Sequence, residues 1–177
     1  MSEVRIRRAA VDDVPFLVGL ATHEDVEPFL GAVAARDADT VVAEVERSAA
    51  ESRRFGRFVV EVEEAGKWSR AGAIGFEAAS VRHRIAHLER LAIHPAFRGR
   101  RLADEAARRL QRHLVFELGY HRLQLEIYGF NDRAIAHAIR VGFVREGVKR
   151  RAYWRHERWN DGVMFGLLRE DLERTYS

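Results

Sequence analysis

The sequence predicts an α/β fold, a sheet flanked by helices. Two observations carry this prediction. Apolar residues alternate with period two in residues 57–80, 122–128 and 143–168, which is typical of strands. Residues 86–118 contain a strand, a basic loop and a long amphipathic helix in direct succession. A chain of 177 residues with 47% hydrophobic content can form a proper core, so we expect a single domain over residues 1–177.

The N-terminal third is predicted to hold one short strand and three helices. Residues 4–8 alternate as a strand, and Asp12 or Asp13 then caps a helix. A second, short helix is predicted for about residues 24–30. Asp39 has the position of a cap for a third helix, which runs to about Ser52. The predicted inward side chains are Val14, Leu17, Val18 and Ala21 in the first helix, and Val41, Val42, Val45 and Ala49 in the third.

A hairpin and the central strand follow. The hairpin consists of Arg57–Glu63 and Trp68–Ser80, with its turn through residues 64–67. The next strand, Ala86–Ile93, cannot continue past His94, because Pro95 lacks an amide donor and restricts the residue before it. Strand alternation places two sets of side chains on opposite faces: His87, Glu89 and Leu91 on one, and Leu88, Arg90 and Ala92 on the other.

The C-terminal half is predicted to alternate helices and strands. A helical stripe begins at Leu102 and stops at Gly119, and Arg122–Tyr128 adds a strand. A helix over Asp132–Val141 ends at Gly142. Residues 143–168 then form two antiparallel strands, and local chemistry favours a turn at Asn160, Asp161 and Gly162.

The loop before the long helix suits an anionic ligand. It reads Arg98-Gly99-Arg100-Arg101-Leu102-Ala103. Small residues let the backbone approach a ligand, and the first amides of a helix have no internal acceptor. Such a site fits a phosphate or pyrophosphate. The alternative is an ordinary strand-to-helix crossover with solvated arginines.

Two segments resemble the GNAT family of acyl-CoA-dependent N-acetyltransferases. The first is Leu91-Ala92-Ile93-His94-Pro95 with the loop after it, in which Arg101 stands where the family usually has its second glycine. The second is Asn131-Asp132-Arg133-Ala134, followed by Gly142-Phe143. The resemblance implies the GNAT fold, a mixed, mostly antiparallel sheet whose central strands splay apart to admit acetyl-CoA. Among subgroups, the ribosomal-protein N-terminal (alanine/serine) acetyltransferase branch is the most similar.

The resemblance also implies a cofactor site and an earlier turn in the last hairpin. It assigns acetyl-CoA binding to Leu91, Ala92, Ile93, Arg98, Gly99, Arg100, Arg101, Leu102, Ala103 and Asn131. It places the last turn near residues 155–158. We favour this turn, because Val163, Phe165 and Leu167 then complete a longer alternating strand.

Acetyl transfer needs a neutral amine, and the resemblance places a base on the central strand. Glu89 is our first candidate and His87 the second; the alternatives are that Glu89 pairs with an arginine and that His87 is an ordinary half-buried histidine. Deprotonating a lysine-like amine at pH 7 costs roughly 4 to 5 kcal/mol, against about 1 to 1.4 kcal/mol for an α-amine. The family's tyrosine proton donor is replaced by Ala138, so His137 and Tyr128 both remain candidates.

The predicted function is acetyl transfer from acetyl-CoA to a primary amine, with a protein N-terminal α-amine as the leading acceptor. Alternatives are a small-molecule amine, such as a polyamine, an aminoglycoside or an amino acid, and a catalytically silent CoA-binding module. In the family, the region of the acidic segment His23–Glu27 lines the acceptor groove, and acidic residues there would suit a cation; they also suit a solvated helix face.

The composition argues against several other kinds of site, location and partner. The chain has no cysteine, which excludes disulfides and a cysteine nucleophile, and its eight histidines lack metal-site spacing, so we expect no metal. It has no apolar run long enough for a membrane span or secretory signal, so we expect a cytoplasmic protein. The net charge of +3 could indicate nucleic acid, but the basic cluster from residue 98 to 112 lacks interleaved aromatics, which makes that partner unlikely. A homodimer is left open.

Overall fold

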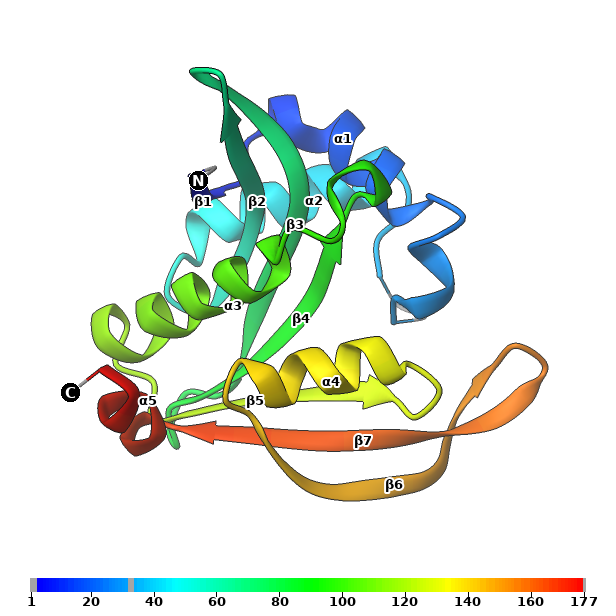
Figure 1. The fold of residues 1–177 in the computed structure, drawn as a ribbon, viewed down its shortest axis with the longest axis vertical. Helices are drawn as coiled ribbons and strands as arrows, with labels where there is room; N and C mark the ends of the chain where they lie inside the picture. Colours follow the sequence, from blue (N-terminus) through cyan, green and yellow to red (C-terminus); the bar gives the residue numbers. More distant parts are fainter. Residues whose placement is uncertain (1–2, 32–33, 177) are drawn as a thin grey trace. The chain divides into compact units, whose positions relative to one another are not determined.

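A computed structural model of the chain describes residues 3–31 and 34–176, and confirms the predicted α/β fold with a mixed, mostly antiparallel sheet (Figure 1). The strand order is β1-β2-β3-β4-β5-β7-β6. The strands are β1 (Val4–Arg8), β2 (Phe55–Glu64), β3 (Lys67–Ser80), β4 (Ile85–Ile93), β5 (Arg122–Tyr128), β6 (Val144–Arg155) and β7 (Arg158–Leu168). The helices are α1 (Val14–Ala21), α2 (Ala38–Ala50), α3 (Leu102–Arg112), α4 (Asp132–Arg140) and α5 (Arg169–Tyr176).

Two compact units make up the chain. The first unit contains Met1–Glu77 and Leu88–Leu110, and the second contains Ala78–His87 and Gln111–Ser177. The strand β4 therefore contributes its first residues to the second unit and its remaining residues to the first. Whether the whole chain acts as one domain stays a prediction.

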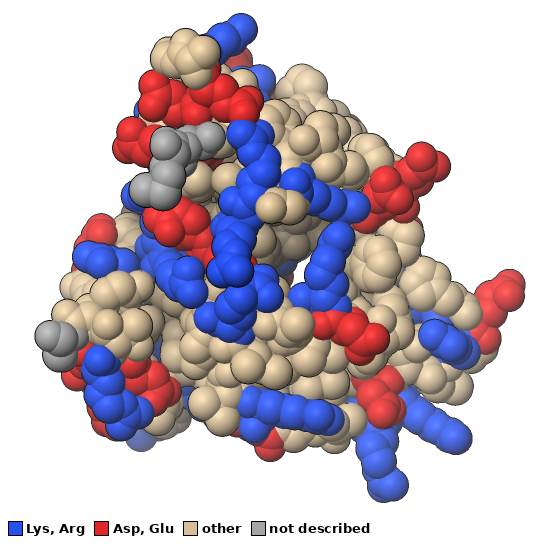
Figure 2. Space-filling model, in the orientation of Figure 1, with Lys and Arg blue, Asp and Glu red and all other residues tan. Residues whose placement is uncertain are grey.

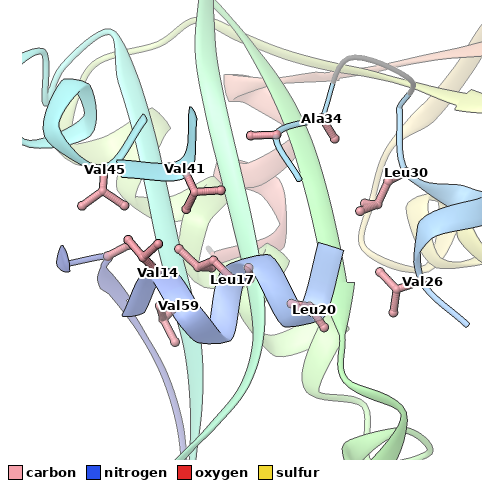
Figure 3. Packing of buried hydrophobic residues seen from close by; sticks show 12 residues of the cluster. Val14, Leu17, Leu20, Val26, Leu30, Ala34, Val41, Val45 and Val59 are labelled. Atoms are coloured by element: carbon pink, nitrogen blue, oxygen red, sulfur yellow. The ribbon is translucent and has the colours of Figure 1, made fainter. Parts of the chain in front are cut away.

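The core of the first unit lies between helices α1 and α2 and the strands β2 and β3. Its buried members include Val14, Leu17 and Leu20 from α1, Val41 and Val45 from α2, and Val59 from β2 (Figure 3). Every residue of β2 from Phe55 to Val62 is buried, so both faces of this strand are covered. In Figure 1, α3 crosses in front of β2 and β3, and α2 lies behind them.

The helix boundaries of the first unit correct two predictions. The N-cap of α2 is Asp37, not Asp39, and Asp37 Oδ1 accepts a hydrogen bond of 2.8 Å from the Thr40 amide. Ala49 is exposed, and Ser48 takes the buried position beside it. The predicted short helix over residues 24–30 is a single 3-10 turn, Glu27–Phe29, since Pro28 supplies no amide to extend it.

The predicted cap of α1 has a different task. Asp13 lies at the N-cap, but its carboxylate makes no capping bond. It is 1% exposed and pairs instead with Arg7 Nη1 at 2.6 Å and with Arg70 Nε at 2.7 Å. Arg7 also reaches Glu61. These ion pairs join β1, β2 and β3 to the start of α1.

The first hairpin ends in the turn that the sequence predicts. Ala65 and Gly66 connect β2 and β3, and their φ angles are 51° and 76°. Two successive positive φ values are typical of a two-residue hairpin turn that matches the twist of the strands.

We expect Gly72→Ala to destabilise the protein by about 2 to 3 kcal/mol, because extra volume in a filled space forces the backbone to shift. A Cβ atom at residue 72 would lie 2.4 Å from the Ala92 carbonyl oxygen and 2.7 Å from Ile93 Cδ1. Urea unfolding measures the effect. The matched control is Gly19→Ala in α1, where a Cβ atom meets nothing within 4 Å, and equal effects of the two substitutions would contradict the prediction.

The second unit follows the sequence prediction at β5 and α4, whereas the last part of the predicted helix before Gly119 is a π-helical turn, His113–Glu117, and α5 was not predicted. Strand β5 covers the predicted residues, and α4 ends before Gly142, whose φ is 97°. The turn of the last hairpin lies at His156 and Glu157, both with positive φ, so the earlier of the two predicted turns is correct. The Asn160–Gly162 stretch belongs to β7.

The parallel ladder between β4 and β5 is short. It contains three pairs, Ile85 with Arg122, Ala86 with Leu123, and His87 with Gln124. By contrast, all seven residues of β5 pair with β7. The pairing recorded between these central strands is therefore confined to their first residues. None of the helices in the described residues is long and apolar enough to cross a membrane.

Candidate active site

The start of α3 in the first unit offers backbone donors. The strand β4 ends at Ile93, and the 3-10 turn Pro95–Phe97 leads into the loop before α3. The first internal bonds of α3 run from the amides of Asp104 and Glu105 to the Arg101 carbonyl, at 3.1 and 3.2 Å. The two preceding amides, of Leu102 and Ala103, have no acceptor among the described residues. Free amides at a helix start attract an anion.

Two residues of this loop have left-handed backbones. Gly99 has a φ of 81°, and a Cβ atom there would meet nothing within 4 Å. Arg101 has a φ of 57°, in the region that glycine enters without cost and that costs other residues about 1 kcal/mol. The loop therefore keeps the conformation of the glycine motif although arginine stands at residue 101. The Arg101 side chain is exposed.

Arginines surround this helix start. Arg98 Nη2 donates a hydrogen bond of 2.8 Å to the Asp25 carbonyl, and Arg100 forms an ion pair with Glu64. Figure 2 shows Lys and Arg side chains gathered on the face where α3 and the loop before it lie in Figure 1. The positive charge supports anion binding at the free amides.

A pair of histidines links the loop to the acidic segment. The rings of His23 and His94 meet edge-on, with centroids 5.3 Å apart, and His94 Nδ1 accepts a hydrogen bond of 3.3 Å from the Ala96 amide. Within the acidic segment, Glu27 is paired with Arg36, whereas the side chains of Glu24 and Asp25 are exposed. The Arg98–Asp25 bond therefore joins this segment to the loop before α3 directly.

Glu89, the first candidate base, lies in a cluster of buried and half-buried charges. Its Oε1 atom is 3.3 Å from Arg90 Nε but has no hydrogen-bond partner within the described part of the chain. Arg90 Nη1 donates to Glu44 Oε1. Glu44 Oε2 is 3.1 Å from Arg57 Nε, close enough for an ion pair, although the two atoms are not aligned for a hydrogen bond. Burial, reinforced by the charge of Arg90, lowers the pKa of Arg57 to about 10.

The backbone at Arg90 corrects the predicted alternation of β4. Arg90 has a φ of 57°, which interrupts the extended conformation inside the strand. Neighbouring side chains of a regular strand point to opposite faces, yet Glu89 and Arg90 contact each other. The two-face assignment made from the sequence therefore does not hold beyond Arg90.

Three of the predicted site residues of β4 lie at its end. Leu91, Ala92 and Ile93 are each partly buried, and the following amide of His94 donates to the Ala71 carbonyl at 2.9 Å. This bond fixes the end of the strand against β3 within the first unit.

The two remaining predicted residues belong to the second unit. His87 is half-buried in the short ladder with β5. Asn131 is the N-cap of α4, and its Oδ1 accepts a hydrogen bond of 3.2 Å from the Ala134 amide. Asn131 thus has a structural task whether or not it also contacts a cofactor.

The second unit contains the candidate proton donors and one tyrosine that sequence reasoning missed. Tyr128 stacks on Phe130 at 5.2 Å and meets the Tyr153 ring edge-on at 5.6 Å. Tyr153 donates a hydrogen bond of 2.7 Å to Glu126, and burial, together with this carboxylate, raises the pKa of Tyr153. His137, by contrast, lies in the last turn of α4.

Glu44 and Arg57 are the other residues that the sequence did not identify. Arg57 could have been suspected, because it is a charged residue inside an apolar strand. Glu44 gave no signal, since a glutamate on an amphipathic helix is ordinarily solvated. The described residues contain no group of three or more His, Asp or Glu side chains that could hold a metal ion.

Parts of the chain match a protein family and a curated protein. The family described as Acetyltransferase (GNAT) domain matches residues 3–144. A curated relative, the SPbeta prophage-derived uncharacterized N-acetyltransferase YokL of Bacillus subtilis, is 31% identical over 86 residues, which are 49% of this chain and 49% of the relative. The chain therefore spans about half the length of the curated relative that it matches.

Solved structures share the fold over nearly the whole chain. A spermidine N-acetyltransferase from Vibrio cholerae, in complex with CoA and spermine, has a TM-score of 0.82 and 20% identity, and the match covers 95% of this chain and 96% of that one. A dodecameric structure of spermidine N-acetyltransferase from Vibrio cholerae in an intermediate state has a TM-score of 0.80 and 20% identity, with 98% of each chain covered. At these identities the likeness establishes the fold.

Proposed function

Because this chain belongs to the GNAT acetyltransferase family, we propose that it transfers the acetyl group of acetyl-CoA to a primary amine. The observation that carries the proposal is the start of α3. Two amides, at Leu102 and Ala103, have no acceptor in the part of the chain that the structure describes, and they lie among arginines after β4 and its 3-10 turn. This arrangement suits the pyrophosphate of a nucleotide-bearing thioester.

The first unit supplies most of the proposed acetyl-CoA site. Gly99 leaves open space for a ligand, and Arg98, Arg100 and Arg101 supply positive charge. The backbone of residues 91–93 would hold the pantetheine arm. When bound, acetyl-CoA supplies the thioester whose carbonyl carbon a neutral amine attacks. A backbone amide at the developing oxyanion can contribute roughly 3 to 4 kcal/mol to this step.

We propose Glu89 as the group that takes the proton from the acceptor's ammonium, directly or through water. Its partly buried carboxylate has an Oε1 atom without a hydrogen bond among the described residues, which supports this role. His87 is the second candidate. The departing thiolate also needs a proton, for which Tyr128 and His137 remain the candidates.

A small-molecule amine is the first candidate acceptor. The support is the likeness in fold to spermidine N-acetyltransferases, together with the exposed carboxylates of Glu24 and Asp25 in the first unit. Exposed carboxylates attract cationic amines.

A protein N-terminal α-amine is the second candidate, and the small cost of removing its proton favours it. Deprotonating an α-amine at pH 7 costs only about 1 to 1.4 kcal/mol, against roughly 4 to 5 kcal/mol for a lysine-like amine.

A turnover screen tests the proposal. Acetyl-CoA consumption should be measured with spermidine, an aminoglycoside, free amino acids and peptides with a free α-amine, and the acetylated product identified by mass spectrometry. Turnover with spermidine alone supports the first candidate, and turnover with the peptides alone supports the second. If CoA binds but every amine fails, the chain is a CoA-binding module.

We expect Arg98→Ala to weaken acetyl-CoA binding by about 10-fold, the size of one lost charge-assisted hydrogen bond. The loss should be larger at low ionic strength than at high, because salt screens the missing attraction. Isothermal titration at two salt concentrations measures it. The control is Arg109→Ala, which removes an equal charge from an α3 side chain paired with Glu105. If both variants bind acetyl-CoA alike, Arg98 makes no specific contact.

A further inference from the structure

Four buried or half-buried charges in the first unit form one connected group around Glu44. Glu44 extends from α2 and contacts Arg90 with one carboxylate oxygen and Arg57 with the other. Arg90 also lies against Glu89. The side chains of Glu44 and Arg90 are each 15% exposed, and that of Arg57 is 8% exposed, so solvent screens these charges weakly.

The geometry holds both arginines toward Glu44. The strong contact of Arg90 is made by Nη1 to Glu44, whereas its contact with Glu89 at 3.3 Å lacks hydrogen-bond alignment. Arg57 packs closely against β3. A Cβ atom added at Gly75 of that strand would lie only 2.9 Å from Arg57 Nη1. Glu89 consequently keeps an oxygen without a hydrogen bond although two guanidinium groups are near.

We propose that Glu44 is a positioning residue for acetyl transfer, which engages Arg90 and Arg57 and so leaves Glu89 able to accept a proton from the acceptor amine. This inference rests on the proposed function of Glu89. The charged residues recorded in this group come from α2 (Glu44), β2 (Arg57) and β4 (Glu89 and Arg90), and Gly75 of β3 lies beside Arg57.

The effect of removing Glu44 follows from the charges. With Glu44 present the group carries two negative and two positive charges. Without it both arginines have only Glu89 as a counter-charge, and a carboxylate stabilised by an adjacent guanidinium is a weaker base. The left-handed backbone at Arg90 brings Arg90 within reach of Glu89, so Glu44 and Glu89 compete for the same guanidinium.

The test is the pH profile of kcat/KM for Glu44→Gln. We expect its acidic limb to move down by about one pH unit, and kcat at pH 7 to fall about 10-fold. The KM for acetyl-CoA should stay unchanged, because the recorded ion-pair partners of Glu44 lie on β2 and β4 and not at the start of α3. The matched control is Glu46→Gln, an exposed glutamate on the same helix, which should leave the profile unaltered. Glu44→Asp should shift the limb in the same direction by less, and replaces the glutamine variant if that one does not fold.

A double-mutant cycle with Glu89→Gln separates positioning from mere support of the fold. If Glu44 acts through Glu89, the double variant should be no slower than Glu89→Gln alone. Additive losses, or an acidic limb that does not move while Glu89→Gln is inactive, overturn the inference and leave the proposed function intact. If Glu89→Gln keeps the full rate, both the proposed base and this inference are wrong.

Discussion

Glu89→Gln should lower kcat by about 10²- to 10⁴-fold, the usual contribution of a positioned general base. The substitution keeps the shape of the side chain and removes its ability to take a proton. Acetyl-CoA affinity should not change, because the free amides and arginines of the loop before α3 remain. Steady-state kinetics together with acetyl-CoA titration measure the two quantities separately.

The pH dependence of the rate of Glu89→Gln is a second test of the role of Glu89. Without a protein base, the amine must lose its proton to solvent, so the rate of Glu89→Gln should keep rising with pH toward the pKa of the acceptor amine. Loss of acetyl-CoA affinity in parallel with rate would instead show that Glu89 supports the binding site. In that case His87 becomes the first candidate base.

Asp13→Asn should destabilise the fold by about 3 kcal/mol, because breaking a buried ion pair leaves its partners without a counter-charge. Asp13 is 1% exposed and holds both Arg7 and Arg70. For a domain of this size, the melting temperature should fall by about 6 to 12 °C. The control is Asp12→Asn, because Asp12 is the exposed neighbour and forms none of these pairs. Equal melting temperatures of the two variants would contradict the assignment.

The contribution of Asp13 should also depend on pH. The hydrogen bonds from Arg7 lower the pKa of Asp13 from 3.8 to about 2. A carboxyl whose pKa is lowered by folding stabilises the protein fully above its unfolded pKa and loses that contribution as pH falls through its folded pKa. The shift corresponds to about 2 kcal/mol. The difference in unfolding free energy between wild type and Asp13→Asn should therefore shrink between pH 3.8 and about pH 2.

The elements that the sequence predicted well are those whose signals are local. Period-two alternation located the strands, Pro95 ended β4, and Gly142 ended α4, because each of these effects acts within a few residues. The loop before α3 was singled out as a cofactor site by its arginines and by its place after the strand, and that role stays a prediction. The failures at the caps are also local: Asp37 and Asp39 are equally good candidates by residue type, and only the fold selects one.

The alternative that Glu89 pairs with an arginine anticipated its neighbour Arg90, but the other charges of the group could not be predicted, because Glu44 and Arg57 are distant from Glu89 in sequence. Glu44, Arg57 and Arg90 come from a helix and two different strands, and nothing in a single sequence pairs them. The left-handed backbone at Arg90 was likewise unforeseen, since arginine carries no preference for it. The sequence therefore identified the candidate base, while its electrostatic surroundings required the structure.

The backbone of Arg101 changes what the family's phosphate-loop signature should be taken to mean. At Arg101 an arginine holds the positive φ that the pattern usually assigns to glycine, and the amides of Leu102 and Ala103 that follow it have no acceptor among the described residues. A sequence search that requires glycine at the position of Arg101 would miss chains of this kind. Descriptors written in dihedral angles would retain them.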